Sequence, residues 1–395
     1  MSEIMQGFPV PPEQRIPRSE WDRPPWNRWS FQHVREILPT AEMWRGDGKP
    51  WKLARKEKDL ANVHFVTSKN TTTTVQHWLD TSYTDAFLVM HNGKIAFEQY
   101  HNGMNERSLH LAQSMTKSFT AVLAGILIGR GLLNPAEKIS KYLPELEATG
   151  WQGASLQQVM DMTTGVIYNE DYDAVDSDIA VTDVASGWKL PHHGREYPAC
   201  IWDQIVGLTG RSRKHGALFE YRSIETDVLA HCLERVTQTR LAELMSRELW
   251  QPLGCEENAC FTVDSVGYAL ADGGLNACLR DYARFGQMLL QQGKANGRQI
   301  VPRAFVEDIP AGNHDLFKEP YTLATPNGAY HNQFWIEDVD TGAFMARGVF
   351  GQLIYVDTAH QMVVVKLSSW PEFVSLPRLK TKLRAIHAIA DYLNN

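Results

Sequence analysis

Strand signals are strongest at two places that lie far apart in the chain. Residues 86–100 (AFLVMHNGKIAFEQY) hold two β-prone runs around Asn92-Gly93, the pair that favours a tight type I′ hairpin turn. Residues 353–370 contain a second pair of such runs around a short polar turn. The stretch from about Ser114 to Gly293 has mostly helical spacing instead. The simplest architecture is an α+β fold, in which both chain ends build one sheet and a helical lobe is inserted between them.

The sequence predicts three parts on this basis. Trp21, Trp26 and Trp29 would be left in water unless the N-terminal segment packs on the body. A cleft at the boundary between the lobes is the expected site. The predicted parts are an arm at residues 1–40, a sheet lobe at 41–113 and 294–395 that ends in a helix at 375–395, and a mainly helical lobe at 114–293 whose loop at 165–216 lines the cleft.

Composition excludes several functions. The chain has 395 residues, of which 43% are hydrophobic and 22% charged, and a net charge of −7. That balance argues against nucleic acid or an anionic membrane as a partner. No stretch has the length of a membrane span, and the N-terminus lacks an export signal, so a cytoplasmic location is expected. The five cysteines include no Cys-x-x-Cys, which favours isolated buried thiols over a zinc or redox site.

Ser114 and Lys117 form a Ser-x-x-Lys pair at the start of an apolar helix. Residues three apart share a helix face, so the hydroxyl and the amine can meet. Burial of Lys117 would lower its pKa and produce the neutral amine that a base must be. The alternative is a helix N-cap at Ser114 and a solvated Lys117. A second copy, Ser186 and Lys189, lies in the loop-like region, where nothing enforces that pairing.

A proton relay and an oxyanion site complete the hypothesis. Tyr221 precedes a helix start and is the favoured relay, with Tyr330 as the weaker alternative. The backbone N–H groups of Ser114 and Val349 are the expected oxyanion donors. Gly348 and Gly351 flank Val349, and glycines within a strand indicate a close approach by a ligand or another backbone. A plain β-bulge is the alternative for this segment.

The ordered motifs Ser114-x-x-Lys117 and Tyr221-x-Ser223, followed by a late strand, resemble the penicillin-recognising serine hydrolases. That family contains class C β-lactamases, DD-peptidases and related esterases. The stretches YNEDY, TDVLAHCLERVT and VVVKLSSWP resemble its 6-aminohexanoate-dimer hydrolases, and the similarity runs from about Trp26 to the C-terminal helix. The resemblance implies a β-lactamase-like fold, an antiparallel sheet flanked by helices, and a homodimer.

The resemblance also implies roles for individual residues. Ser114 would be the acylated nucleophile, Lys117 its base and Tyr221 the proton relay. Tyr172 would hydrogen-bond the scissile amide, and Asp183 would hold a free amino group of the substrate; a solvated loop aspartate is the alternative for Asp183. The Lys-Thr-Gly strand motif of β-lactamases is absent, and RGVFG takes its place. This weakens the case for recognition of a β-lactam carboxylate.

The sequence therefore predicts a serine hydrolase that cleaves a small linear amide or ester through an acyl-enzyme, with no metal or cofactor. Two alternatives stay open. One is an enzyme that cleaves esters only. The other is a penicillin-binding-like protein that is acylated and turns over β-lactams slowly.

Overall fold

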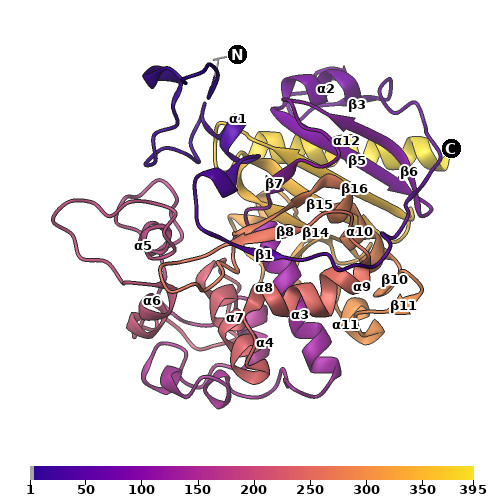
Figure 1. The fold of residues 1–395 in the computed structure, drawn as a ribbon. Helices are drawn as coiled ribbons and strands as arrows, with labels where there is room; N and C mark the ends of the chain where they lie inside the picture. The colour runs from indigo at the N-terminus through magenta and orange to yellow at the C-terminus, as the bar shows by residue number, and fades with distance from the viewer. Residues whose placement is uncertain (1–3) are drawn as a thin grey trace.

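The computed structural model describes residues 4–395, and its centre is an eight-stranded sheet. The strand order is β12-β13-β14-β15-β16-β5-β6-β2, antiparallel except for the parallel pair β2–β6. Figure 1 shows that the first and last parts of the chain together build the lobe with this sheet, and that the middle of the chain builds a helical lobe beside it. The predicted β-lactamase-like α+β architecture is confirmed.

The elements of both lobes have the following bounds. The strands are β1 (Thr40–Met43), β2 (Ala54–Arg55), β3 (His64–Val66), β4 (Thr72–Thr74), β5 (Thr84–His91), β6 (Lys94–Tyr100), β7 (Leu109–Leu111), β8 (Ala259–Thr262), β9 (Leu275–Cys278), β10 (Lys294–Ala295), β11 (Arg298–Gln299), β12 (Ala329–His331), β13 (Phe334–Asp338), β14 (Ala343–Gly348), β15 (Gln352–Asp357) and β16 (Met362–Ser368). The helices are α1 (Asn27–Ser30), α2 (Val75–Thr81), α3 (Met115–Gly129), α4 (Leu156–Met160), α5 (Asp178–Ala185), α6 (Ile201–Gly207), α7 (Ile224–Thr237), α8 (Leu241–Met245), α9 (Gln251–Leu253), α10 (Leu279–Leu290), α11 (Arg303–Asp308) and α12 (Leu376–Asn394).

The pairing of β5 with β16 joins the two ends of the chain. Both strand pairs expected from the sequence are present, as β5–β6 and β15–β16. Asn92 and Gly93 turn the first hairpin with φ of 49° and 73°, as a type I′ turn requires. β16 then runs antiparallel beside β5 from Met362, opposite His91, to Ser368, opposite Thr84.

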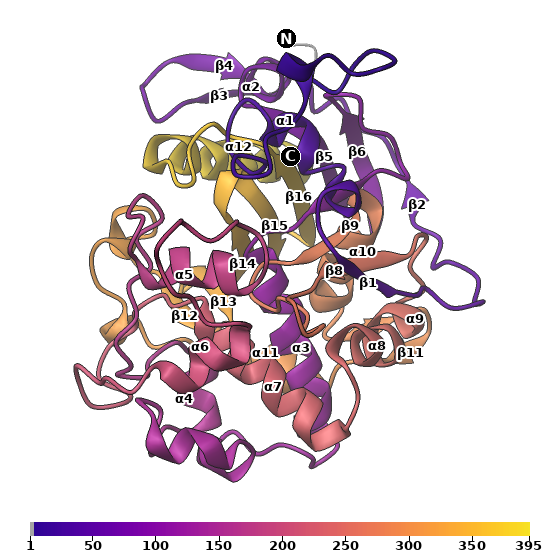
Figure 2. The same cartoon turned by 60° about the vertical axis from the view of Figure 1, so that its left-hand side comes forward.

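The sheet is buried on both faces, which explains the unbroken apolar runs in its central strands. Side chains alternate along a strand. Ala86, Leu88 and Met90 therefore join the core that contains α10, whereas Phe87 and Val89 join the core that contains α12. Figure 2 shows α12 and α10 with the sheet between them, and α3 passing from the sheet into the helical lobe.

Two features differ from the sequence expectation. A second sheet, in the order β1-β8-β9-β7, lies next to the start of α3 and was not predicted. Its strands have only three or four residues each, too few to show a clear alternation. Residues 165–216, expected to be loop, contain the short helices α5 and α6.

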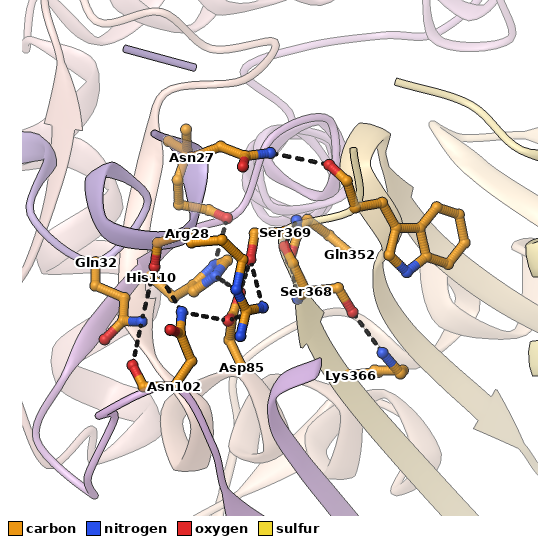
Figure 3. Close-up of polar contacts among 12 residues, drawn as sticks. Asn27, Arg28, Gln32, Asp85, Asn102, His110, Gln352, Lys366, Ser368 and Ser369 are labelled. Atoms are coloured by element: carbon orange, nitrogen blue, oxygen red, sulfur yellow. Dashed lines mark hydrogen bonds and ion pairs between the residues drawn. The ribbon is translucent and has the colours of Figure 1, made fainter. Parts of the chain in front are cut away.

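The N-terminal segment is fixed to the body by a buried polar cluster around Asp85. Arg28 donates to Asp85 Oδ1 at 2.8 Å, and Ser369 Oγ donates to Asp85 Oδ2 at 2.7 Å (Figure 3). His110 Nε2 lies 3.0 Å from Asp85 Oδ2. Asn27 donates to the Trp370 carbonyl at 2.9 Å. This segment therefore reaches strand β5 and the chain just after β16; residues 1–3 of the expected arm lie outside the described part.

Further along the arm, Trp21 is fully buried and its indole N–H donates to the carbonyl of Trp188 at 2.8 Å. Trp26 and Trp29 stay half-buried.

All five cysteines are buried and unpaired, as expected. Within residues 4–395, none of the helices combines the length and apolar character needed to cross a bilayer.

The Asp85 cluster generates a stability prediction. Asp85→Ala should lower the free energy of unfolding by about 3–5 kcal/mol, because it leaves the buried His110 and the partly buried Arg28 without their anion. Burial raises the pKa of Asp85, but His110 and Arg28 outweigh it and hold the pKa below its usual value. The contribution is therefore present above the unfolded-state pKa of about 4 and is lost as pH falls through the lower folded-state value.

Urea denaturation of the wild type and the variant at neutral and acidic pH measures this effect. Asp59→Ala is the matched control, because Asp59 is exposed and its carboxylate accepts a hydrogen bond from the nearby Asn62 side chain. A loss for Asp85→Ala no larger than the control's would contradict the structural role of the cluster.

Candidate active site

Ser114 stands at the first turn of α3, directly after a strained residue. Gln113 has φ of 51°, a value uncommon for a residue other than glycine. The Ser114 side chain makes no capping hydrogen bond to the helix backbone. Instead its Oγ accepts a hydrogen bond from Lys117 Nζ at 3.0 Å. The N-cap alternative is therefore wrong, and the Ser-x-x-Lys pair meets as its spacing predicts.

Lys117 is 1% exposed and surrounded by acceptors. Its amine also donates to the carbonyl of Asp272 at 2.8 Å and lies 3.7 Å from the Asp272 carboxylate. Burial lowers the pKa of Lys117, but Tyr221, Asp272 and Glu170 outweigh burial, and the pKa lies above its ordinary value. The expectation that burial leaves a neutral amine is wrong, because the sequence did not reveal that Asp272 and Glu170 lie near this amine.

Tyr221 reaches both members of the pair. Its hydroxyl interacts electrostatically with Ser114 and Lys117, and its ring centroid lies 5.2 Å from Lys117 Nζ. Burial raises the pKa of the Tyr221 phenol, and the positive charge of Lys117 opposes that rise. Trp335 stacks on the Tyr221 ring with a centroid distance of 5.4 Å. The alternative, Tyr330, is buried behind Tyr221, and its hydroxyl donates to Gln333 Oε1 at 3.4 Å.

The second Ser-x-x-Lys copy has a structural role. Ser186 is buried and donates to the carbonyl of Asp183 at 3.2 Å. Lys189 forms an ion pair with Asp22 and donates to the carbonyl of Ser19 at 2.9 Å. The two side chains thus have other partners, and the lysine holds the N-terminal arm.

The end of β14 passes close to the residues that precede Ser114. A Cβ on Gly348 would lie 2.6 Å from the Ala112 carbonyl oxygen and 3.0 Å from Gln113 Cβ, so only glycine fits there. Val349 follows directly and lines both cavities that Ser114 lines. This agrees with the close backbone approach that the glycines indicated. The oxyanion role of the Ser114 and Val349 N–H groups stays a prediction.

Ser114 lines two cavities. The larger has a volume of about 400 Å³ and is lined mainly by aromatic and aliphatic side chains, with Tyr221 and Arg347 among them. The smaller has a volume of about 40 Å³. Four lining residues are common to both cavities: Ser114, Tyr172, Val349 and Phe373. The two cavities therefore adjoin each other at the serine.

Both residues suggested for substrate binding lie at these cavities. Tyr172 stacks on Phe373 with a centroid distance of 5.2 Å, and its hydroxyl donates to Glu170 Oε1 at 2.7 Å. Asp183, on α5, lines the smaller cavity. Burial and the nearby Asp22 raise the pKa of Asp183 to about 8, although Lys189 opposes them. Asp183 is therefore not a solvated loop aspartate.

The sequence reasoning missed three acidic residues next to the serine–lysine pair. Glu170 accepts hydrogen bonds from the backbone N–H of Ser223, at 2.8 Å, and from its hydroxyl. Asp272 contacts Lys117 directly. Burial and the Asp272 carboxylate raise the pKa of Asp227 well above its usual value. Glu170 stands two residues before Tyr172, so its position beside a predicted site residue could have indicated a role in the site. Asp272 precedes two glycines and has the sequence context of an ordinary turn residue, so nothing in the sequence indicated its role.

Comparisons with known proteins agree with this geometry. The 6-aminohexanoate-dimer hydrolase of Paenarthrobacter ureafaciens is 34% identical over 354 residues, which cover 89% of this chain and 88% of that protein. A solved structure from Bacillus anthracis, provisionally assigned as a 6-aminohexanoate-dimer hydrolase, superposes with a TM-score of 0.89 at 30% identity and covers 98% of this chain and 99% of its own.

A family VIII carboxylesterase shares the fold with a TM-score of 0.60 at 14% identity, covering 78% of this chain and 92% of its own. The sequence profile described as Beta-lactamase matches residues 81–388. Because this match spans most of the protein and the curated relative covers nearly all of it, the chain belongs to the β-lactamase family of serine hydrolases.

Proposed function

We propose that the protein hydrolyses a small linear amide or ester through an acyl-enzyme on Ser114. One observation carries the proposal: Ser114 Oγ is hydrogen-bonded to Lys117 Nζ at 3.0 Å, and the Tyr221 hydroxyl contacts both. A serine hydroxyl becomes a nucleophile when a neighbouring base takes its proton, and these two groups are the candidates for that base.

The base is the Lys117–Tyr221 pair rather than a lone neutral lysine. The raised pKa of Lys117 keeps its ammonium charged at rest, and the raised pKa of Tyr221 keeps its phenol protonated. The pair must release one proton before it can accept the proton of Ser114. Removing that proton leaves either a neutral amine or a phenolate stabilised by the ammonium, and both forms lie within hydrogen-bond reach of Ser114.

Attack then produces a tetrahedral oxyanion, for which the N–H groups of Ser114 and Val349 are the proposed donors. Tyr221 passes the proton to the leaving amine or alcohol, and water later cleaves the acyl-enzyme with the same pair as base. Tyr172 lies at the junction of the two cavities, which supports a hydrogen bond to the scissile amide.

Asp183 supports an amide substrate that carries a free amino group. Its carboxyl lines the small cavity, and a bound ammonium would favour the charged form of this group. The curated relative is named for the 6-aminohexanoate dimer, a linear amide, which agrees with that substrate class. An activity on esters needs only Ser114, Lys117 and Tyr221 and is expected to accompany it.

A homodimer and a cytoplasmic location remain proposals that rest on the family resemblance and on the sequence. Light scattering after size-exclusion chromatography measures the first, and fractionation of the source cells measures the second.

The nucleophile assignment makes the first functional prediction. Ser114→Ala should lower kcat/KM on p-nitrophenyl esters by about 10⁴-fold or more, with an unchanged melting temperature. An acylating phosphonate probe should add its mass to the wild type at Ser114. Ser186→Ala is the matched control, because it removes the serine of the second motif, and it should keep both turnover and labelling. Turnover by Ser114→Ala would refute the mechanism, and a labelling burst without steady turnover would identify a penicillin-binding-like protein.

The charge state of Lys117 predicts the pH dependence of acylation. Because the pKa of Lys117 lies above its ordinary value, the reactive form with one proton fewer becomes more populated as pH rises. For a neutral ester, kcat/KM should increase throughout the range from about pH 6 to pH 9. A plateau already reached at the acidic end would mean that Lys117 is neutral at rest. Lys117→Arg keeps the charge but cannot give up the proton, and should be inactive across the range.

The role of Asp183 is tested by a ratio of two activities. Asp183→Ala should lower kcat/KM for an amine-ended amide relative to that for a neutral ester by about tenfold or more, because only the amide presents an ammonium group. Asp176→Ala, an exposed aspartate of the same segment, should leave the ratio unchanged. An equal loss on both substrates would show that Asp183 supports the fold of the cavity instead of binding the amine.

A further inference from the structure

A third cavity is separate from the two at Ser114. It has a volume of about 530 Å³ and shares no lining residue with either of them. Its wall comes from the loop that joins α6 to α7 and from the segment around the start of α4: Arg211, Ser212, Arg213, Lys214, His215, Gly153 and Gln158. We call it the basic cavity, because the residues that line it include three cations and no carboxylate.

The loop that carries these cations is fixed to the segment that follows α4. The backbone N–H of Ser212 donates to the carbonyl of Gly165 at 2.8 Å, and that of Gly216 donates to the carbonyl of Thr163 at 2.7 Å. A Cβ on Gly165 would lie 1.9 Å from the carbonyl oxygen of Arg213, so only glycine allows this close approach. The cavity wall is therefore a defined part of the fold.

His215 belongs to this scaffold and adds no positive charge. Its Nδ1 accepts the backbone N–H of Gly165 at 2.9 Å, so the ring proton is on Nε2, which lies 3.1 Å from the carbonyl oxygen of Gln152. Burial and the guanidinium groups of Arg211 and Arg222 lower the pKa of His215, although the Gln152 carbonyl opposes them. The histidine is therefore neutral at neutral pH.

Arg213 shares its carboxylate partner with a second guanidinium group. Oε2 of Glu220 accepts hydrogen bonds from both Arg213 and Arg222. The buried Glu225 also acts on Arg222 and offsets part of this charge. Nε of Arg213 is buried and has no hydrogen-bond partner in the described chain. Arg213 thus retains a donor that the fold leaves unused.

Two further cations of the cavity have no carboxylate partner. Within residues 4–395, neither Arg211 nor Lys214 forms an ion pair, and Arg211 donates to the carbonyl of Gln152 at 3.2 Å. Both side chains are exposed, and exposed arginine and lysine are charged at neutral pH. Gln158 uses its side-chain oxygen to accept the N–H of Ser155 at 2.9 Å, which leaves its amide N–H groups as additional donors. The wall thus combines positive charge with several hydrogen-bond donors.

We propose that the basic cavity binds the phosphate group of a small molecule, held by Arg211, Arg213 and Lys214. A guanidinium group presents a planar fork of donors to phosphate oxygens, and lysine adds a compact charge. The net charge of the chain is −7, so the rest of the surface would repel a long polyanion and the ligand is small. The volume leaves room for an organic group attached to the phosphate. This site is independent of the hydrolysis proposed above.

Calorimetry on the wild-type protein at a fixed ionic strength tests the proposal with two probes, inorganic phosphate and glycerol 3-phosphate. At least one probe should bind saturably to one site, with a Kd below about 1 mM. Tighter binding of the ester would identify a phosphorylated organic molecule as the ligand. Tighter binding of inorganic phosphate would identify the free ion, and either result supports the site.

Two variants locate the binding in the basic cavity. Arg211→Gln combined with Lys214→Gln should weaken binding of the probe by about tenfold or more. Lys214→Glu alone should also weaken it, and this change affects one exposed side chain with no hydrogen bond in the described chain. The matched control combines Arg298→Gln with Lys69→Gln, which removes the same charges at exposed positions outside this cavity, and it should keep the wild-type affinity.

Melting temperatures show whether each variant is folded, and Lys214→Glu decides the question if the double variant is not. Absence of saturable heat with both probes up to about 10 mM would overturn the inference. Unchanged affinity in a folded variant of the cavity would overturn it as well. An equal loss of affinity in the control would show that the probes respond to the overall charge of the protein, which also contradicts a site in this cavity.

Discussion

A buried ammonium group needs negative partners, and the site is organised around that of Lys117. Its amine is held by Ser114 from the same helix, by the Asp272 carbonyl before β9 and by Tyr221 before α7. Glu170 adds negative charge from the segment between α4 and α5. Four separate parts of the chain therefore converge on one nitrogen atom. Ser114 has no capping hydrogen bond, and its hydroxyl accepts one from this amine instead.

The charge distribution along the substrate path is uneven. Acidic groups gather around Lys117 and in the smaller cavity, where Asp183 and Asp272 lie. The larger cavity is lined mainly by aromatic and aliphatic side chains, with Arg347 among them. The two cavities that share Ser114 therefore differ in polarity.

Local signals in the sequence were sufficient to predict some features of the fold and of the site. The β5–β6 hairpin, the β15–β16 pair and the meeting of Ser114 with Lys117 each depend on residues a few positions apart, where turn chemistry and helix spacing decide the outcome. The role of Tyr221 was predicted from its position after Ser114 in the chain, together with the family resemblance. Asp272 could not be found in this way, because it reaches Lys117 only through the packing of β9 against β7 at the start of α3. The sequence predicted a lowered pKa for Lys117, and the structure gives a raised one. Burial of the lysine can be inferred from the apolar residues that follow it in the sequence. The carboxylates that help to outweigh burial come from distant parts of the chain, so they could not be inferred.

The attachment of the N-terminal arm has a consequence for how the protein is assembled. Arg28 and Asn27 bind to Ser369 and Trp370, which follow the last strand of the sheet, and Trp21 binds the carbonyl of Trp188 in the segment that carries Asp183. A ribosome releases the arm long before residues 369–370. The arm therefore stays unattached to its partners after β16 until those residues have emerged from the ribosome.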